Sequence, residues 1–324
     1  MQTIAQYQQL ISDFLATKKW EKEPLDLYQP IQYILDLGGK RMRPVLTLMA
    51  AEACGGRAED ALSAALAIEL FHNFSLIHDD IMDEAPLRRG KPTVHHKWNV
   101  NTGILSGDAM LILAYQMLET YPAELYKPLN QLFSKTAIEV CEGQQLDVDF
   151  ERKAAVATEE YLHMIAYKTA VLLGCAMKMG AHIAKADEET AQRFYDFGRL
   201  LGIAFQIQDD YLDAFGNPET FGKQVGGDII ENKKTYLYIT ALQQANEEQK
   251  ASLLKWYADD KHATDEKIHA VKTLFAASKA DIATTDAVKN YTDKALNQLD
   301  FMQIPTQAKE ELRAFALHLM GRNV

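Results

Sequence analysis

The chain contains two short acidic segments of the same form, Asp-Asp-x-x-Asp, at 79–83 and 209–213. Each follows an apolar run, where a carboxylate is costly unless a cation compensates its charge. Helix positions four residues apart share a face, so the first and last Asp of each segment point the same way. Oxygen ligands with no cysteine nearby suit Mg²⁺, which is often shared with substrate phosphates. The segments therefore predict a magnesium site; the alternative is a pair of solvated acidic helix ends, with His78 an ordinary packed or surface histidine.

Two compact basic clusters accompany the acidic segments. The first, 38–44, reads Gly-Gly-Lys-Arg-Met-Arg-Pro, and the second, 88–91, reads Arg-Arg-Gly-Lys. Arg makes bidentate contacts with phosphate, and Lys acts as a point charge. Later lysines, each more often a solvated surface residue when taken singly, are Lys168, Lys223, Lys233 and Lys234. Together the clusters indicate two anionic ligands, one bridged by metal and one held directly by Lys and Arg.

The elements that must position these groups are helices. Apolar residues recur at spacings of three and four over 61–76, 104–118, 129–146, 161–179 and 190–212. We find no convincing set of alternating strands bounded by turn residues. Glycine and proline punctuate the chain between these runs, and no linker rich in Gly, Ser or Pro divides it. The sequence predicts an all-α bundle in a single domain, 1–324.

Composition excludes several classes of protein. The 324 residues are 48% hydrophobic and 24% charged, which suits a large core and not a disordered chain. The net charge of −11, without a long Lys/Arg run, argues against nucleic-acid binding. The three cysteines match no zinc or disulfide pattern, so we expect a reduced, cytoplasmic location. The N-terminus lacks the basic flank of a secretory signal, and the unbroken apolar runs are too short to span a membrane.

In order and spacing, these motifs resemble those of the trans-isoprenyl diphosphate synthases, the polyprenyl synthetase family that includes farnesyl and geranylgeranyl diphosphate synthases. The other segments that carry the resemblance are Gly-Gln-Gln-Leu-Asp (143–147), Lys168-Thr169, Ala-Phe-Gln-Ile-Gln (204–208), Gly222-Lys223 and Asn232-Lys233. The resemblance implies helices around a central cavity (the isoprenoid synthase fold) and a homodimer. It also implies that an allylic diphosphate (dimethylallyl, geranyl or farnesyl) ionises, that isopentenyl diphosphate attacks the cation, and that a proton is lost.

The resemblance also assigns roles by position. It implies that isopentenyl diphosphate binds to Lys40, Arg43, His72 and Arg89. The allylic diphosphate would bind to Arg88, Lys168, Lys223 and Lys233. Two or three Mg²⁺ ions would be ligated by Asp79, Asp83 and Asp209, with supporting carboxylates at Asp80, Asp147, Asp210, Asp213 and Asp228. The catalytic residues would be Lys168, Thr169 and Gln206, the last two facing the reacting carbon. No general base is obvious, and the released diphosphate is expected to take the proton.

The residues before the first acidic segment predict the product length. Phe74 lies five residues before Asp79, and Phe71 lies three further back. In the family, a large residue at the first of these positions limits the growing tail, and Ser75 leaves room beside it. We therefore expect a product of fifteen to twenty carbons, geranylgeranyl ahead of farnesyl diphosphate. The alternative is that Phe74 merely packs against a neighbouring helix.

Two departures and three rival functions accompany this interpretation. Bacterial farnesyl synthases often have two extra residues within the first acidic segment, and many family members end in a basic tail. This chain has neither feature; it ends Gly-Arg-Asn-Val at 321–324. A terpene cyclase would replace the second acidic segment, and a non-catalytic subunit of a heteromeric synthase would usually lose one segment. A His-Asp phosphohydrolase, suggested by His78-Asp79, would want histidine where Gln208 lies.

Overall fold

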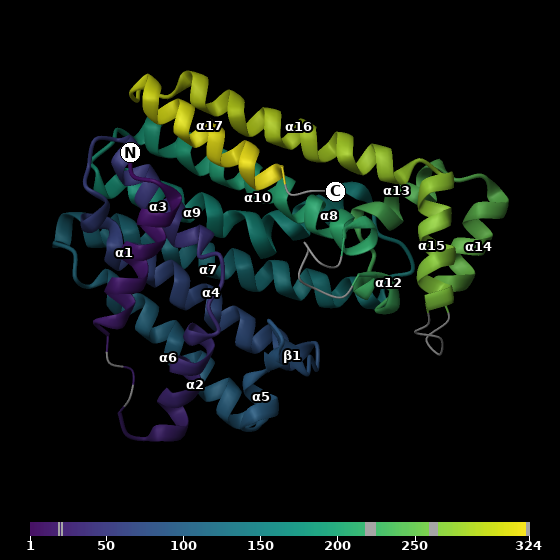
Figure 1. Ribbon diagram of the computed structural model, residues 1–324, viewed down its shortest axis with the longest axis horizontal. Coiled ribbons are helices and arrows are strands. Elements are labelled where there is room, and N and C mark those ends of the chain that lie inside the picture. Colours follow the sequence, from purple (N-terminus) through teal and green to yellow (C-terminus); the bar gives the residue numbers. More distant parts are fainter. Residues whose placement is uncertain (19, 21, 218–224, 259–264, 322–324) are drawn as a thin grey trace. The chain divides into compact units, whose positions relative to one another are not determined.

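The computed structural model describes the chain except residues 19, 21, 218–224, 259–264 and 322–324 (Figure 1). Helices dominate the described residues. They are α1 (Ile4–Ala16), α2 (Leu25–Asp36), α3 (Met42–Ala53), η1 (Ala58–Ala61), α4 (Leu62–Met82), α5 (Val94–Lys97), α6 (Val100–Leu118), α7 (Ala123–Arg152), α8 (Thr158–Ile165), η2 (Ala166–Ala170), α9 (Val171–Ile183), α10 (Glu188–Phe215), α12 (Gly227–Ile230), α13 (Tyr236–Gln244), α14 (Glu247–Tyr257), α15 (Asp265–Ala277), α16 (Ala280–Phe301) and α17 (Thr306–Met320). The predicted all-α class is confirmed, and the described part of the chain adds one small hairpin, β1 (Leu87–Arg88) with β2 (Lys91–Pro92).

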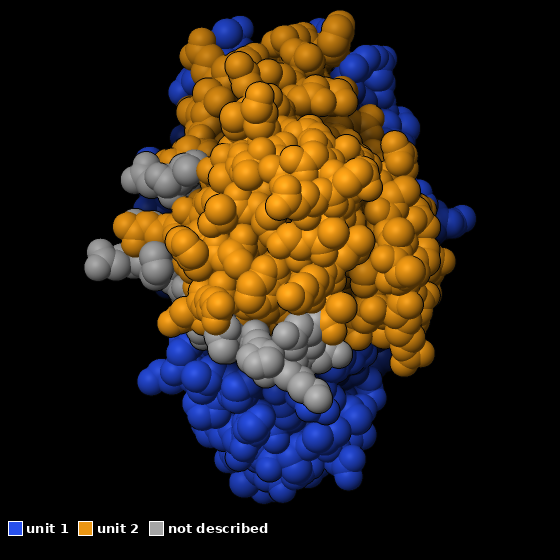
Figure 2. Space-filling view, turned by 90° about the vertical axis from the view of Figure 1, so that its right-hand side faces the viewer, with its two compact units in different colours: residues 1–135, 175–195, 303–308 blue, residues 136–174, 196–302, 309–324 orange. Residues whose placement is uncertain are grey.

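The chain divides into two compact units, shown in blue and orange in Figure 2. Unit 1 comprises residues 1–135, 175–195 and 303–308, and unit 2 comprises 136–174, 196–302 and 309–324. The first acidic segment and both basic clusters belong to unit 1, whereas the second acidic segment belongs to unit 2. The single domain expected from the sequence stays a prediction, and the two units are described separately below.

Unit 1 is built around α4, whose 21 residues include an unbroken buried run from Ala64 to Phe71. Its main partner within the unit is α6, and α3 also packs against it (Figure 1). The helix α6 begins where the Asn99 side chain accepts a hydrogen bond from the Thr102 amide at 2.9 Å. Because α4 is enclosed on several sides, its apolar residues continue around the helix, and the first acidic segment ends this core helix.

The stretch Ala58–Met82, which includes α4, is long and apolar enough to cross a membrane, and no other helix among the described residues is. The unbroken apolar runs had predicted no such stretch. In the structure, 67% of its most apolar window is buried inside the protein, as in the core helix of a globular fold. The structure therefore shows no clear membrane span in the described residues.

Unit 2 places its core around α8, η2, α10 and α13, with side chains such as Ile165, Ile203, Ile207 and Leu237 packed together. The predicted continuous helix over 161–179 is interrupted, because Ala166–Ala170 forms a π-helical turn. Such single π turns occur inside α-helices, frequently at functional sites. This turn contains two of the predicted site residues, Lys168 and Thr169. Elsewhere in the unit, α14 lies beside α15 and α13 packs on α16 (Figure 1).

Candidate active site

The first acidic segment separates into a buried middle carboxylate and two more exposed flanking ones. Asp80 is only 1% exposed, and Arg88 binds both of its oxygens. The Arg88 Nε lies 2.8 Å from Oδ2, and Nη2 lies 2.6 Å from Oδ1. Asp79 is half-buried on the last turn of α4, and Asp83, which caps the helix, is exposed. The carboxylates of Asp79 and Asp83 are therefore better placed to reach a ligand than that of Asp80.

Arg43 and His72 form one of the pairs expected for an anion site. The Arg43 Nη1 lies 3.1 Å from Nε2 of His72. Burial lowers the pKa of His72 well below its usual value of 6.5, and the charges of Arg43, Arg89 and Arg88 lower it further. A guanidinium can only donate, so Nε2 accepts and the neutral ring carries its proton on Nδ1. His72 thus has a fixed donor, the Nδ1–H, available for a second partner.

Glu69 is a member of this cluster that the sequence analysis missed. It lies one turn before His72 on α4 and is 6% exposed. Asn73 donates to it twice, from Nδ2 to the backbone oxygen at 2.8 Å and to Oε1 at 3.2 Å. Burial raises the pKa of Glu69, whereas Asn73 and the nearby Arg43 counteract that shift. A lone carboxylate within an apolar helical run was the available signal, because such a group needs compensating cations.

The glycine pair of the first basic cluster brings its backbone against Arg89. Gly39 has φ +140, and a Cβ at this position would lie 2.8 Å from Nη2 of Arg89. The positive φ favours glycine, and a side chain at this position would displace the Arg89 guanidinium. The neighbouring Lys40 is exposed, and its backbone oxygen accepts a hydrogen bond from Gln8 at 2.8 Å. The two basic clusters, predicted from separate stretches of sequence, are thus adjacent in unit 1.

The π-helical turn of unit 2 holds Lys168 against Asp147. The Lys168 Nζ lies 2.5 Å from Oδ2 of Asp147, so the two predicted residues form an ion pair. The pair depends on the close approach of α7, because a Cβ at Gly143 would lie 2.1 Å from the backbone N of Lys168. The predicted Gly-Gln-Gln-Leu-Asp segment therefore contributes both the space and the counter-charge for Lys168.

The second acidic segment also has a buried middle carboxylate, Asp210, which is 6% exposed. The Tyr161 hydroxyl and the Tyr236 backbone N–H donate to its Oδ2, the latter at 3.4 Å. The Gln206 Nε2 donates to Oδ1 at 3.1 Å, and the Gln206 Oε1 accepts from the Thr169 hydroxyl at 3.1 Å. Burial raises the pKa of Asp210 to about 6. The structure thus joins Thr169 and Gln206, the predicted catalytic pair, to Asp210.

Further carboxylates gather near the second acidic segment. The Asp228 backbone N–H donates to Oδ2 of Asp213 at 3.0 Å, and the Lys233 Nζ lies 3.8 Å from Oδ1 of Asp228. Burial raises the pKa of Asp228 well above its usual range, and the charges of Asp210 and Asp213 raise it further. An accumulation of carboxylates of this kind is relieved by a bound cation.

Not all of the residues named from the sequence lie in the described part of the chain. Lys223 is outside the described residues, as is Arg322 near the C-terminus. Within the described residues, no group of three or more His, Cys, Asp or Glu side chains is gathered as a metal cluster. The proposed metal ligands Asp79 and Asp83 belong to unit 1 and Asp209 to unit 2. These assignments stay predictions.

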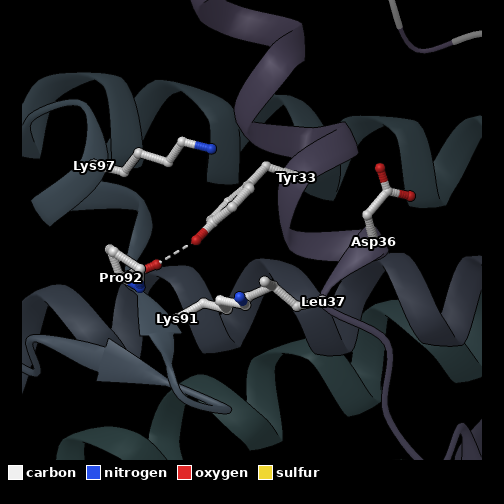
Figure 3. Close-up of a pocket in the computed structure, with 6 residues that line it drawn as sticks. All are labelled: Tyr33, Asp36, Leu37, Lys91, Pro92 and Lys97. Atoms are coloured by element: carbon white, nitrogen blue, oxygen red, sulfur yellow. Dashed lines mark hydrogen bonds between the residues drawn. The ribbon is translucent and has the colours of Figure 1, made fainter.

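A hollow of about 500 Å³ lies in unit 1, and Lys91 of the second basic cluster is one of the residues that line it (Figure 3). The Tyr33 hydroxyl donates to the Pro92 oxygen at 2.7 Å, and the Lys97 ammonium lies 3.7 Å from the centre of the Tyr33 ring. Asp36, Leu37 and Lys91 complete the lining. None of the predicted substrate or metal residues lines this hollow, so we assign it no part in the reaction.

Comparison with known proteins decides between the candidate functions. A family model described as polyprenyl synthetase matches residues 25–274. The chain belongs to the polyprenyl synthetase family. This match covers more than half of the chain and runs through residues of both units. The predicted resemblance is therefore confirmed, and so is the predicted enzyme class, a trans-prenyltransferase.

This polyprenyl synthetase is similar along its whole length to proteins of known name. It is 40% identical over 283 residues to a geranylgeranyl diphosphate synthase of Methanosarcina mazei, covering 86% of this chain and 85% of that protein. A crystal structure of a geranylgeranyl pyrophosphate synthase matches with a TM-score of 0.96 and 52% identity, covering all of both chains. Another, from Corynebacterium glutamicum and complexed with isoprenyl diphosphate and magnesium, matches with a TM-score of 0.85 and 28% identity, covering 99% and 97%. These similarities confirm the predicted isoprenoid synthase fold.

Proposed function

We propose that this prenyltransferase condenses isopentenyl diphosphate with an allylic diphosphate (dimethylallyl, geranyl or farnesyl) and releases an all-trans product of fifteen to twenty carbons, with geranylgeranyl ahead of farnesyl diphosphate. One observation carries the proposal. Both Asp-Asp-x-x-Asp segments bury their middle carboxylate on protein donors, Arg88 for Asp80 and Tyr161 with Gln206 for Asp210. The same construction in two places suits two sets of metal-binding carboxylates and not two solvated helix ends.

The donor chemistry of both units fits magnesium. Asp79 and Asp83 in unit 1, and Asp209 in unit 2, offer hard carboxylate oxygens, the ligands that Mg²⁺ prefers. In unit 2, burial is the main cause of the raised pKa of Asp228, and the carboxylates of Asp210 and Asp213 lie close enough to raise it further. We propose that Asp79, Asp83 and Asp209 hold two or three ions, which would neutralise charge on the diphosphate as it leaves. The complex of the Corynebacterium relative with magnesium is in line with this proposal.

The allylic diphosphate would be held by four cationic side chains. Arg88, Lys168 and Lys233, with Lys223, supply the positive charge that stabilises a leaving diphosphate. In the structure, carboxylates already hold the three of these cations that it describes: Asp80 binds Arg88, Asp147 binds Lys168, and Glu231 binds Lys233. Such pairing fixes the direction of each cation before the substrate binds. Less side-chain conformational entropy is therefore lost on binding.

The isopentenyl diphosphate would bind to the cluster in unit 1. Lys40, Arg43 and Arg89 offer positive charge, and the neutral His72 offers its Nδ1–H as a donor. The buried Glu69 partly balances the arginines and keeps their charges from repelling one another.

The reaction then proceeds in three steps. The bond between carbon 1 and oxygen of the allylic diphosphate breaks, and its electron pair leaves with the diphosphate. The double bond of isopentenyl diphosphate attacks the allylic carbon 1, which forms the new carbon–carbon bond. The proton lost from carbon 2 of the isopentenyl unit goes to the released diphosphate. Throughout, the Thr169 and Gln206 oxygens, 3.1 Å apart, supply dipoles that face the cation.

The tail of the product would be limited by Phe74. On α4 its ring lies 5.4 Å from that of Phe71 and 4.8 Å from that of His78, centre to centre. The Ser75 hydroxyl is turned toward the backbone, because it donates to the His72 oxygen at 2.9 Å. A half-buried aromatic ring held by two others supports the role of a cavity floor.

We also propose a homodimer, located in the cytoplasm. Along α6, large apolar side chains are exposed: Ile104 at 41%, Leu105 at 59% and Ile112 at 58%. Exposed apolar faces of this kind mark protein–protein contacts. The three cysteines, Cys54, Cys141 and Cys175, match no zinc or disulfide pattern in the sequence, which supports a reduced compartment. Analytical ultracentrifugation of the wild type and of Leu105→Asp tests the dimer.

Release of diphosphate tests the function directly and separates it from its rivals. A prenyltransferase releases one diphosphate per condensation, and release requires both isopentenyl and allylic diphosphate. A cyclase would release diphosphate from the allylic substrate alone, and a non-catalytic subunit would release none. A phosphohydrolase would produce inorganic phosphate. Release that does not depend on isopentenyl diphosphate would overturn the proposal.

A further inference from the structure

A chain of hydrogen bonds in unit 2 has a fixed direction. It runs from the Thr169 hydroxyl to the Gln206 carbonyl oxygen, and from the Gln206 amide nitrogen to Asp210. A carboxylate only accepts hydrogen bonds, so the –NH₂ of Gln206 must face Asp210 and its carbonyl oxygen must face Thr169. The reverse orientation would place an oxygen against an oxygen, which leaves a buried acceptor without a donor.

The orientation of the Asp210 carboxylate is fixed, because its other oxygen, Oδ2, also accepts hydrogen bonds. Tyr161, a residue that is 2% exposed, donates a hydrogen bond from its hydroxyl to Oδ2. The backbone N–H of Tyr236, the first residue of α13, also points at Oδ2 at 3.4 Å. The first N–H groups of a helix have no partner within the helix, so this donor is fixed by the fold.

The direction of the chain decides what the catalytic pair offers to substrate. The Thr169 hydrogen is committed to Gln206, so the Thr169 oxygen can present only lone pairs elsewhere. The Gln206 carbonyl oxygen keeps its second lone pair. Both oxygens are therefore acceptors, which attract a carbocation, whereas a reversed amide would present N–H groups that repel it.

Among the described residues, the first acidic segment has no hydrogen bond of this kind between its middle carboxylate and a side-chain amide. The position four residues before Asp80, equivalent to Gln206, is Leu76, and Asp80 is bound by Arg88 instead. The middle carboxylates of the two segments are thus both buried but have different partners. Asp80 orients the guanidinium of Arg88, whereas Asp210 orients the side-chain amide of Gln206.

We propose that Asp210, held by Tyr161, is a positioning residue that sets the amide orientation of Gln206 and thereby makes the Thr169–Gln206 pair an acceptor for the allylic cation. This inference rests on the proposed prenyl transfer at the same site. It assigns to Asp210 a function other than metal binding, and it brings Tyr161 into the reaction.

Asp210→Asn tests the proposal because it should reverse the chain. The fixed N–H of Tyr236 selects the Asn oxygen, so the Asn –NH₂ then faces Gln206. Gln206 must turn its carbonyl toward that group and its own –NH₂ toward Thr169. The probes are a diphosphate with a tertiary ammonium nitrogen in place of allylic carbon 3, and its uncharged saturated counterpart. Isothermal titration calorimetry with Mg²⁺ gives a Kd for each in every variant.

The quantity to compare between variants is the selectivity for the ammonium probe. It is the Kd of the uncharged probe divided by the Kd of the ammonium probe. Loss of a favourable dipole at a charged group should lower this selectivity about tenfold in Asp210→Asn. Asp80→Asn is the matched control, since it removes the same charge from the other segment and should weaken both probes alike. In Thr169→Val, the added Asp210→Asn change should lower the selectivity by less than it does in the wild type, because only its effect on the Gln206 amide remains and its effect on the Thr169 hydroxyl is already lost. An unchanged selectivity in Asp210→Asn, or additive effects in the double variant, would overturn the proposal.

Tyr161→Phe keeps the test decisive if Asp210→Asn does not fold. It retains the ring and the carboxylate but removes one donor from Asp210. We expect selectivity for the ammonium probe to fall about threefold and kcat to fall with it, while both KM values stay within about twofold. Unchanged selectivity and kcat would contradict the proposal. If the wild type forms no prenyl product, the proposed function fails, whereas a productive wild type with unchanged selectivity in the variants refutes this inference alone.

Discussion

Arg88 binds both carboxylate oxygens of Asp80, with Nη2 2.6 Å from Oδ1 and Nε 2.8 Å from Oδ2. The pair joins the β1–β2 hairpin to the last turn of α4, and the Asp80 side chain is 2% exposed. It therefore holds a proposed diphosphate ligand and the first acidic segment in one fixed arrangement. The same contact takes Asp80 out of direct reach of a metal ion.

Arg88→Ala should both destabilise the protein and weaken the allylic substrate. Leaving a buried carboxylate without its partner costs about 3 kcal/mol of unfolding free energy. Urea denaturation measures this loss, and steady-state kinetics should show a higher KM for the allylic diphosphate. Lys91→Ala is the matched control, because it removes an exposed cation from the same hairpin. Equal stability of the two variants would show that the pair does not hold the hairpin.

Asp79→Ala and Asp209→Ala should each nearly abolish turnover with the fold intact. Removing a metal ligand loses several kcal/mol of charge stabilisation in the transition state. Asp13→Ala, an exposed carboxylate on α1, should leave turnover unchanged. Activity should vanish with EDTA and return with added Mg²⁺. Near-normal turnover of either variant at saturating Mg²⁺ rules out the assigned role.

Arg43→Ala should mainly raise the KM for isopentenyl diphosphate. A group that binds ground and transition states alike changes KM and leaves kcat intact. His72 loses its hydrogen-bond donor in this variant, so part of the effect should also appear in His72→Gln. Initial rates with each substrate varied in turn measure the effect. A rise confined to the KM of the allylic primer would reverse the assignment of the two sites.

His72 should make the protein less stable in acid. Its pKa in the folded protein is lowered below 6.5 by burial and by Arg43, Arg89 and Arg88, so the unfolded chain binds a proton that the native ring does not. Stability is then lost as the pH falls below 6.5, by up to about 1.4 kcal/mol per pH unit for one group. Urea denaturation from pH 7.5 to 5.0 should show a shallower loss in His72→Gln. His96→Gln, at an exposed position, is the control, and an equal slope in both variants would exclude His72 as the source.

Phe74→Ala should lengthen the product, because it removes the proposed floor. Ser75→Phe should shorten it, because a second aromatic ring takes up the space beside Phe74. Chromatography of dephosphorylated products from the wild type and both variants measures the change. An unchanged distribution in Phe74→Ala would mean that this ring only packs against Phe71 and His78.

The helices and both acidic segments could be predicted from the sequence because their signals are local. The apolar spacing of 61–76 and 190–212 matches α4 and α10, and each acidic segment ends such a run. The identities of Arg43, His72, Thr169 and Gln206 followed from motif order, and the structure places them in pairs.

Other features depend on contacts that spacing does not reveal. The π-helical turn Ala166–Ala170 follows the same apolar period as an α-helix, so periodicity predicted one continuous helix. Glu69 and Tyr161 lie in apolar runs of the sequence. Only their hydrogen-bond partners in the structure distinguish a residue that supports the site from one that merely packs in the core. Asp80 pairs with Arg88, eight positions later in the sequence, and motif order alone does not specify this contact.

The most direct test of the account is product analysis of the wild-type enzyme. Purified protein is incubated with labelled isopentenyl diphosphate, an allylic primer and Mg²⁺, and the dephosphorylated products are separated by chain length. The account predicts linear all-trans alcohols of fifteen to twenty carbons, with geranylgeraniol in excess. No labelled prenyl alcohol, a cyclic hydrocarbon, or a main product beyond twenty-five carbons would contradict it.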